Sequence, residues 1–393
     1  MNNTQKKNMF FACLSVLLGT IGFGAVAPYF PLFVKELGVE TSIELWAGIL
    51  FSSSYLTGAI AAPFWGSLSD KHGRKIMAIR ASLSSTIIYF LISYSVSRPQ
   101  LLILQLVVGA LAGFVPASVA MIATSVPDED IGKAIGYIYT SAAAGSVIGP
   151  LLGGLVANIG GIRNIFRIAS ALLLVTTLIV FLFINEEKKI VNNNKISVFK
   201  DLGFIKKNKN IIITLIALVG VQISMVSLNP VLSLHVEKIL GTEKANVMTG
   251  FIFSSKQLAL IIATPIWVKI GELFSFRKVL ILGSFIGAII CFIQLMFNSI
   301  TIMWLLFFCY GLFIAGLIPA TNTILAKSVS TEYRGRVFGV TTTANQIGVF
   351  IGPIVSGYIA GFKGIKGVFI FMGIILLLTC LIVKENLTEG DSH

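Results

Sequence analysis

Lys256 is the only charged residue in the apolar stretch 246–268. Burying a lone ammonium in hydrocarbon costs at least about 2.5 kcal/mol, so we expect this side chain to face a central polar cavity rather than lipid. There it would bind an anionic group of a small molecule or titrate. The structural alternative is that Lys256 donates to backbone carbonyls or extends towards the membrane surface.

Other polar or aromatic side chains in apolar stretches are candidates for the same cavity. Amides hydrogen-bond between helices at least as readily as they contact ligands, and tyrosines can form aromatic walls. No Asp or Glu lies in the middle of an apolar stretch, so the usual intramembrane proton carrier is missing. The candidates are Gln105, Gln222, Asn229, Gln257, Asn345, Gln346, Tyr29 and Tyr55.

A short basic segment, Gly66-Ser-Leu-Ser-Asp70-Lys71-His72-Gly73-Arg74-Lys75, separates two apolar stretches. We expect Gly66 to allow close helix approach and Gly73 to take a positive φ in a tight turn. Asp70 would lie at a neighbouring helix N-terminus, and Arg74 would pair with an acidic group. The alternative is a solvated basic turn that only fixes membrane topology.

Glycines recur along the stretch 134–157 with the spacing G-x8-G-x3-G-P-x2-G-G. Such glycines flatten one stripe of a helix, so that another helix can pack very closely against it. The proline removes a backbone donor and bends the helix. A bent, closely packed helix pair is suited to a gate. The residues are Gly136, Gly145, Gly149, Pro150, Gly153 and Gly154.

The elements that carry these residues are long apolar segments. Of the 393 residues, 55% are hydrophobic and 12% are charged, and the mean hydropathy is +0.90. Runs of about 20 apolar residues recur, each long enough to cross the bilayer as a helix. The sequence therefore predicts an all-α membrane protein. The expected spans are 9–34, 46–66, 76–96, 101–126, 134–157, 165–184, 211–235, 246–268, 278–298, 301–326, 336–360 and 367–384.

The formal net charge of +13 is explained by topology. Most of the 30 Lys and Arg residues fall on the side of the membrane that holds the N-terminus, which predicts cytoplasmic termini by the positive-inside rule. Nucleic acid is not expected as a partner, because no soluble basic domain exists. The four cysteines lie inside apolar runs without CxxC spacing, so neither a disulfide framework nor a metal site is expected.

An internal repeat divides the chain into two halves. The charged segment 185–210 is a predicted cytoplasmic linker between a half at 1–184 and a half at 211–393. Equivalent residues are 202 positions apart as far as Trp65 and Trp267 and 203 positions apart from Gly113 and Gly316 onward, so one residue is inserted after Trp267. Pairs that recur include Gly48 and Gly250, Trp65 and Trp267, Gly145 and Gly348, and Pro150 and Pro353. Duplicated halves with a site at their interface are typical of secondary transporters.

The segment Gly66–Lys75 resembles the G-x-L-x-D-x-x-G-R-[KR] signature of the major facilitator superfamily, and Lys269–Lys278 is a decayed second copy. The glycine stripe resembles the antiporter signature of drug efflux members, and its second copy departs from it at Ser356. The likeness covers nearly the whole chain and is closest to the twelve-span drug:proton antiporters. It implies a major facilitator fold of two pseudo-symmetric six-helix halves.

The same resemblance implies roles for individual residues. Gly66, Asp70, Gly73 and Arg74 would latch a cytoplasmic gate, and the glycine stripe would set an outward direction of transport. Gln105 departs from the pattern, because the family usually carries an Arg there that is implicated in proton coupling. Gln cannot hold a permanent charge.

We therefore expect a secondary transporter that exports small molecules by alternating access. The proton gradient is its expected energy source, since no G-x-x-x-x-G-K-[ST] loop for ATP is present. No cofactor, nucleophile–base pair or obligate protein partner is expected, so the chain is not predicted to be an enzyme. Substrates would be multiple drugs or anionic amphipathic compounds. The alternatives are a dedicated exporter of an anionic metabolite such as a carboxylate siderophore, a substrate-specific importer, or a non-transporting sensor. The expected location is a bacterial inner or plasma membrane.

Overall fold

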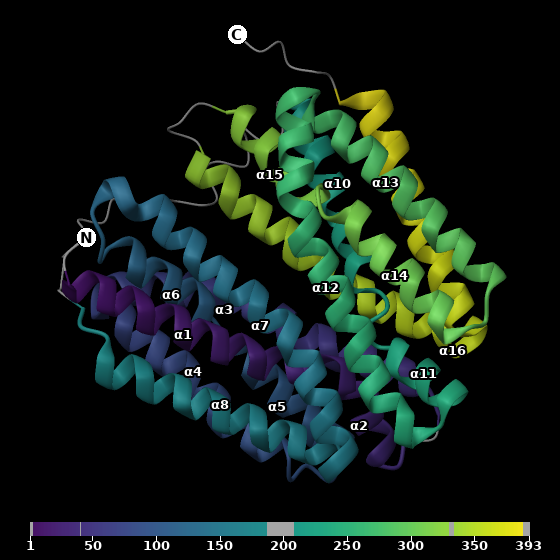
Figure 1. Ribbon diagram of the computed structural model, residues 1–393, viewed down its shortest axis with the longest axis horizontal. Helices are drawn as coiled ribbons and strands as arrows, with labels where there is room; N and C mark the ends of the chain where they lie inside the picture. Colours follow the sequence, from purple (N-terminus) through teal and green to yellow (C-terminus); the bar gives the residue numbers. More distant parts are fainter. Residues whose placement is uncertain (1–2, 40, 187–207, 330–333, 388–393) are drawn as a thin grey trace. The chain divides into compact units, whose positions relative to one another are not determined.

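The computed structural model describes residues 3–39, 41–186, 208–329 and 334–387, and these residues form helices without strands (Figure 1). Eleven helical segments are long and apolar enough to cross a membrane. The last of them belongs to α16 (Arg334–Asn386), which is interrupted at Gly364, where φ is 61° and ψ is −165°. Two crossing segments therefore meet at Gly364, and the twelve expected spans are accounted for.

Two of the expected spans in the first half are discontinuous helices. The first consists of α1 (Asn3–Val26), the 3-10 turn η1 (Ala27–Tyr29) and α2 (Phe30–Glu36). Pro28 and Pro31 explain this break, because proline has no N–H to donate to the preceding turn. The fourth consists of α5 (Arg98–Ala110) and α6 (Phe114–Ala123), which are separated by Gly113 with φ +119°.

The equivalent spans of the second half are broken at the equivalent places. The seventh span consists of α10 (Lys209–Val226) and α11 (Leu232–Leu240), with Pro230 between them. The tenth consists of α14 (Ile300–Ile314) and α15 (Leu317–Lys327). The repeat in the sequence is therefore also a repeat in backbone geometry.

The remaining helices are continuous, apart from single 3-10 turns. In chain order they are α3 (Ile43–His72), α4 (Arg74–Ile92), η2 (Asp128–Asp130), α7 (Ile131–Gly160), α8 (Ile162–Phe183), α12 (Thr242–Leu273), α13 (Phe276–Ile293) and η4 (Gln294–Met296).

The chain folds as two compact units that differ from the two halves in one respect. Unit 1 holds 1–41, 53–193 and 236–254, and unit 2 holds 42–52, 194–235 and 255–393. The first turns of α3 thus pack within the unit built from the second half, and the first turns of α12 pack within the unit built from the first half. Residues 187–207 of the predicted linker lie outside the described residues.

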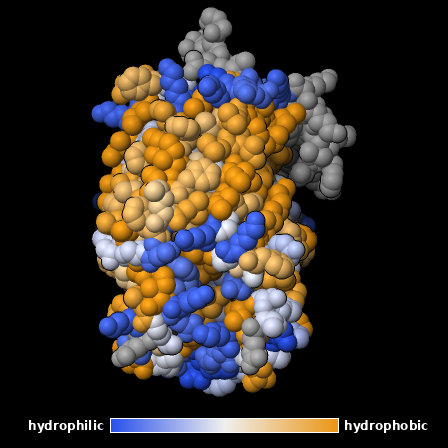
Figure 2. Space-filling model, turned by 90° about the vertical axis from the view of Figure 1, so that its right-hand side faces the viewer, coloured by the Kyte–Doolittle hydropathy of each residue, from blue (hydrophilic) through white to orange (hydrophobic). Residues whose placement is uncertain are grey.

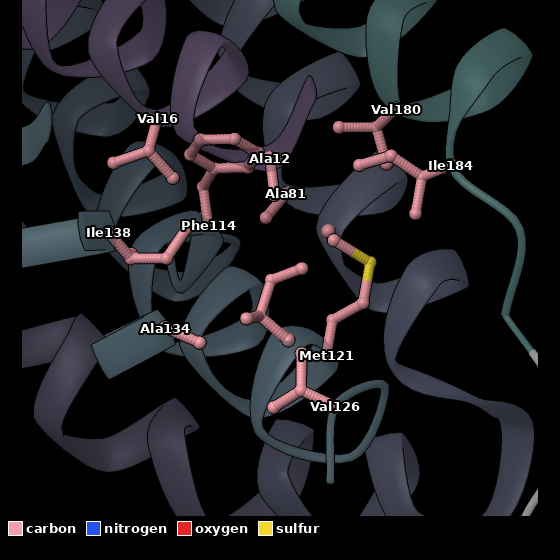
Figure 3. Close-up of a cluster of buried hydrophobic side chains, with 12 residues drawn as sticks. Ala12, Val16, Ala81, Phe114, Met121, Val126, Ala134, Ile138, Val180 and Ile184 are labelled. Carbon is pink, nitrogen blue, oxygen red and sulfur yellow. The ribbon is translucent and has the colours of Figure 1, made fainter. Parts of the chain in front are cut away.

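The core of unit 1 is made mostly of small and branched apolar side chains. Figure 3 shows Val16 of α1, Ala81 of α4, Phe114 of α6 and Ile138 of α7 pointing towards one another. Unit 2 has a smaller cluster of Ile211, Leu325, Val329 and Val337. Many large apolar side chains remain exposed, for example Ile60 at 72% and Phe64 at 61%. Figure 2 shows a broad hydrophobic band on one face with hydrophilic residues at its upper rim, as expected for a multi-pass membrane protein.

Candidate functional site

The two halves repeat the same contacts between side chains and backbone. Trp65 Nε1 donates to the Ala110 carbonyl at 2.7 Å, and Trp267 Nε1 donates to the Leu312 carbonyl at 2.8 Å. The two tryptophans are 202 positions apart in the sequence, and so are the two residues that supply the carbonyls. A buried indole N–H needs an acceptor, and both halves supply it from the equivalent turn of the fourth or tenth span.

A carboxylate accepts hydrogen bonds from the backbone of the turn between α3 and α4. Gly73 has φ +97°, as the tight turn requires. Glu186, just beyond α8, accepts the backbone N–H groups of Arg74 at 2.7 Å and Lys75 at 2.9 Å. A carboxylate at a helix N-terminus satisfies unpaired donors and interacts favourably with the helix dipole. The acidic partner expected for this turn is Glu186, and it binds the backbone of Arg74.

Side chains in this turn bind the ends of other helices. Arg74 Nη1 donates to the Ala120 carbonyl at 2.6 Å, near the end of α6, and Lys75 Nζ donates to the Phe181 carbonyl at 2.9 Å, near the end of α8. The decayed copy makes a similar contact from the position of Arg74, since Arg277 donates to the Lys384 carbonyl at 2.6 Å. Cations are favourable at helix C-termini.

The other two expected gate residues give less information. Among the described residues of its own unit, a Cβ on Gly66 would meet no atom within 4 Å, so they give no support to the close helix approach expected there. Asp70 lies in α3, but its side chain is outside the described set.

The glycine stripe of α7 packs on the backbone of α1, as the spacing predicts. A Cβ on Gly149 would lie 2.8 Å from the Ile21 oxygen and 2.9 Å from the Gly24 Cα. A Cβ on Gly145 would lie 2.8 Å from the Leu17 oxygen. Gly153 faces Ala25, and Pro150 lies inside the helix. Gly136 is different, because nothing lies within 4 Å of its Cβ position.

Lys256 is buried in unit 2, with 7% of its surface exposed. Its ammonium donates to the Met225 carbonyl at 3.2 Å and lies 5.1 Å from the centroid of the Phe307 ring. An ammonium has three N–H donors, and among the described residues only one hydrogen bond and no carboxylate partner engage it. The carbonyl contact fits the structural alternative, while the spare donors leave this cation able to bind a ligand.

Hydroxyl and aromatic groups surround this ammonium. The Phe307 ring lies parallel to the Tyr310 ring, with centroids 5.9 Å apart, and both belong to α14. The Tyr310 hydroxyl is 2.8 Å from the hydroxyl of Ser224, which precedes Met225 in α10. The contacts therefore form a closed ring from Lys256 through Met225, Ser224, Tyr310 and Phe307. Sequence reasoning identified only Lys256 of these five.

A second polar contact in unit 2 joins α10 to α16. The Gln222 amide donates to the Asn345 side-chain oxygen, and Gln222 is 8% exposed. Two residues that were candidates for the cavity thus hydrogen-bond to each other and join two helices. Among the described residues, no hydrogen bond links this pair to Lys256.

In unit 1, the position equivalent to Lys256 has an uncharged residue, and so has the position equivalent to Phe307. Lys256 is equivalent to Ser54, and Phe307 is equivalent to Gln105. The helix contact is the same in both, since Gly109 packs on the Ser54 carbonyl and a Cβ on Gly311 would lie 2.8 Å from the Lys256 carbonyl oxygen. Gln105 is buried, with 3% of its surface exposed.

The remaining candidates are dispersed. Tyr55 and Gln257 are half-buried in α3 and α12, Gln346 is half-buried in α16, and Asn229 lies in the break between α10 and α11. Tyr29 was expected to form part of a cavity wall. In this structure its side chain is 0% exposed, and its hydroxyl donates to backbone carbonyls instead.

Metal chemistry has no support in the part of the chain that the structure describes. There, no group of three or more His, Cys, Asp or Glu side chains could hold an ion. The four cysteines are free thiols.

Comparison with known proteins agrees with this architecture. The family model of the Major Facilitator Superfamily matches residues 12–243 and 214–389. Multidrug resistance protein MdtG of Proteus mirabilis (strain HI4320) is 32% identical over 384 residues, which cover 97% of this chain and 96% of that protein. MdtG of Escherichia fergusonii is 33% identical over 384 residues, with 96% and 93% covered.

Solved structures share the fold at low sequence identity. The nucleoside transporter NupG has a TM-score of 0.82 and 14% identity, covering 97% of this chain and 100% of that one. A D-xylose-proton symporter has a TM-score of 0.81 and 15% identity, covering 100% of both chains. The family match, the curated relatives and the repeated helical halves lead to one conclusion: the chain belongs to the major facilitator superfamily and is a multi-pass membrane transporter rather than an enzyme.

Proposed function

We propose that this transporter exports amphipathic organic compounds from the cytoplasm by proton antiport, and that it favours compounds with an acidic group. The observation that carries the proposal is Lys256, a buried cation with spare donors and no carboxylate partner among the described residues. A buried charge left without a counter-charge is costly. A substrate carboxylate would supply that counter-charge.

Several observations support the coarser parts of the proposal. The curated relatives are named for multidrug resistance, and they come from bacteria. One of the solved structures with this fold is a D-xylose-proton symporter, so the fold is compatible with proton coupling. Basic residues concentrated on one side support cytoplasmic termini in a bacterial plasma membrane.

The choice of an anionic substrate follows from the missing acidic residues. No Asp or Glu lies in the middle of a predicted span, so no membrane carboxylate is available to attract cationic drugs. The Phe307 ring lies beside the Lys256 ammonium and is stacked on Tyr310, so the charge has buried apolar surroundings. Opening of this place during transport would expose apolar area next to one charge, which fits an amphipathic anion.

The test is transport in proteoliposomes with an imposed pH gradient. The probes are carboxyfluorescein, norfloxacin, ethidium and citrate, which cover an amphipathic anion, a zwitterion, a cation and a polycarboxylate. Lys256→Ala should abolish carboxyfluorescein transport, and Lys256→Arg should retain part of it because the charge remains. The matched control is Lys244→Ala, an exposed lysine of the same helix, which should transport as wild type does.

Each outcome selects among the functions considered. Carboxyfluorescein transport that is unchanged in Lys256→Ala would refute the role of this cation. Citrate as the sole transported probe would favour the dedicated exporter of an anionic metabolite. Accumulation in the opposite direction would identify an importer, and transport that ignores a dissipated gradient would exclude proton coupling. A protein that moves no probe, although folded, would favour a sensor.

A further inference from the structure

Tyr29 joins three segments of unit 1 through a single hydroxyl group. Its side chain is 0% exposed and lies in η1, between α1 and α2. The hydroxyl oxygen is 3.0 Å from the Pro150 carbonyl of α7 and 3.0 Å from the Asn246 carbonyl of α12. A phenol has one proton, so the two carbonyls share it. The hydroxyl therefore connects the first turns of α12 to α1 and α7.

Glycines provide the space for this hydroxyl and its ring. A Cβ on Gly154 or on Gly250 would lie 2.8 Å from the Tyr29 hydroxyl oxygen, and a Cβ on Gly153 would lie 2.7 Å from the ring. Real Cβ atoms do not approach this closely. Backbone carbonyls lie closer still, since the Cβ would overlap Ala25 at Gly153, Asn246 at Gly154 and Pro150 at Gly250. Glycine is therefore needed both for the close helix contacts and for the place of Tyr29.

The second half repeats the helix contact but not the hydroxyl. Gly48 packs on Pro353, as Gly250 packs on Pro150. At the place of Tyr29, however, the second half has Val231.

The second glycine signature departs from the first at one position. Ser356 stands at the place of Gly153, and it is accommodated with 0% exposure. A Cβ on Gly153, by contrast, would overlap both the Ala25 carbonyl and the Tyr29 ring. The two halves therefore pack differently at this place.

The first turns of α12 also carry polar groups that this packing leaves unsatisfied. Asn246 and Thr249 are 6% and 0% exposed, and the Asn246 Oδ1 and Thr249 Oγ1 atoms have no hydrogen-bond partner in the part of the chain that the structure describes. Unpaired buried polar atoms destabilise a contact, and water would satisfy them if the contact opened. Ser254 Oγ, which donates to the Val147 carbonyl at 2.5 Å, and the Tyr29 hydroxyl oppose this opening.

We propose that Tyr29 is a positioning residue that latches the first turns of α12 against α7, and that this latch must open in each transport cycle. The inference rests on the proposed transport function, because alternating access requires such contacts to separate. The topology expected from the charges places the latch at the outer end of the membrane spans. Because Val231 replaces the tyrosine in the second half, the latch is present in one copy only.

The experiment measures how often the latch opens, without any substrate. A single cysteine replaces Thr249 in a chain whose four native cysteines are replaced, and intact cells are labelled with a membrane-impermeant maleimide. Tyr29→Phe keeps the ring and removes the shared hydrogen bond. It should speed labelling of position 249 by about fivefold, as expected for one intramolecular hydrogen bond. Tyr89→Phe, a buried tyrosine of unit 1 that contacts Phe23 and Phe166, should leave the rate unchanged.

A second variant protects the test against a packing defect. The single substitution Tyr29→Val introduces the residue found in the second half and leaves Gly153 in place, because a Cβ there would overlap the Ala25 carbonyl. It should fold and label at least as fast as Tyr29→Phe. Labelling of both variants at the wild-type rate would overturn the latch. Because this assay needs no transported compound, a negative result in the carboxyfluorescein assay would refute the proposed substrate and leave the latch intact.

Discussion

The contact between α1 and α7 predicts opposite effects for two alanine substitutions in one helix. Gly149 and Gly136 both lie inside α7, and replacing either by alanine should favour the helix by up to about 1 kcal/mol. At Gly136 the new methyl meets nothing within 4 Å. Gly136→Ala should therefore raise the thermal stability of the purified protein.

At Gly149 the methyl would lie 2.8 Å from the Ile21 oxygen and 2.9 Å from the Gly24 Cα, both of them backbone atoms. Ordinary contact requires these helices to move apart by a few tenths of an ångström, and such overpacking costs about 1–3 kcal/mol. This cost exceeds the gain in helix propensity. Gly149→Ala should therefore be less stable than wild type, and less stable than Gly136→Ala by about 1–3 kcal/mol.

The assay is thermal unfolding in detergent, followed by tryptophan fluorescence, with both variants purified in parallel. Gly352→Ala tests the same reasoning in the second half, because its Cβ would lie 2.9 Å from the Ile223 oxygen. Equal stabilisation of Gly136→Ala and Gly149→Ala would show that α7 does not pack on the backbone of α1. The glycine spacing would then have a different purpose.

Two further predictions compare the halves. Trp65→Phe and Trp267→Phe each remove one indole–carbonyl hydrogen bond from equivalent places, so each should lower stability by about 1 kcal/mol; clearly unequal melting temperatures would contradict the equivalence. Glu186→Gln weakens the carboxylate that binds the first N–H groups of α4, and Ser275→Ala removes the hydroxyl that accepts the Arg277 N–H in α13. Each substitution should lower the free energy of unfolding by roughly 0.5–2 kcal/mol in the same assay. A wild-type melting curve for either variant would show that its side chain does not stabilise the helix N-terminus.

The sequence predicted the fold well because membrane spans are specified by length and apolarity. Lipid-exposed backbone must form helices, so apolar runs of span length leave few alternatives. The interruptions inside the spans were less predictable. Pro28 and Gly113 lie in runs of uniform hydropathy, where only a single residue type marks the break, and proline and glycine also occur in unbroken membrane helices. Pro63 and Pro150, for example, lie inside continuous helices.

The candidate site was predictable at its charged residue only. Lys256 is conspicuous because an ammonium is costly in an apolar run. Its acceptor is a backbone carbonyl of Met225, and a carbonyl has no signature in the sequence. Phe307 is one of 29 phenylalanines, so its residue type carries no information. One available signal was overlooked, since Phe307 is equivalent to Gln105, which had already been selected as a candidate.

The comparison of the halves separates mechanical contacts from chemical ones. Contacts made by glycine and tryptophan with backbone carbonyls are repeated, because both halves must bring the same helices together. The polar side chains at two of these places are not repeated: Lys256 is equivalent to Ser54, and Tyr29 is equivalent to Val231. An asymmetric substrate needs its charged group bound at one place, and a second cation at the equivalent site would only add another buried charge to compensate. The residues that differ between equivalent positions are therefore the ones in which to seek specificity and gating, and those that agree are the ones that hold the helices together.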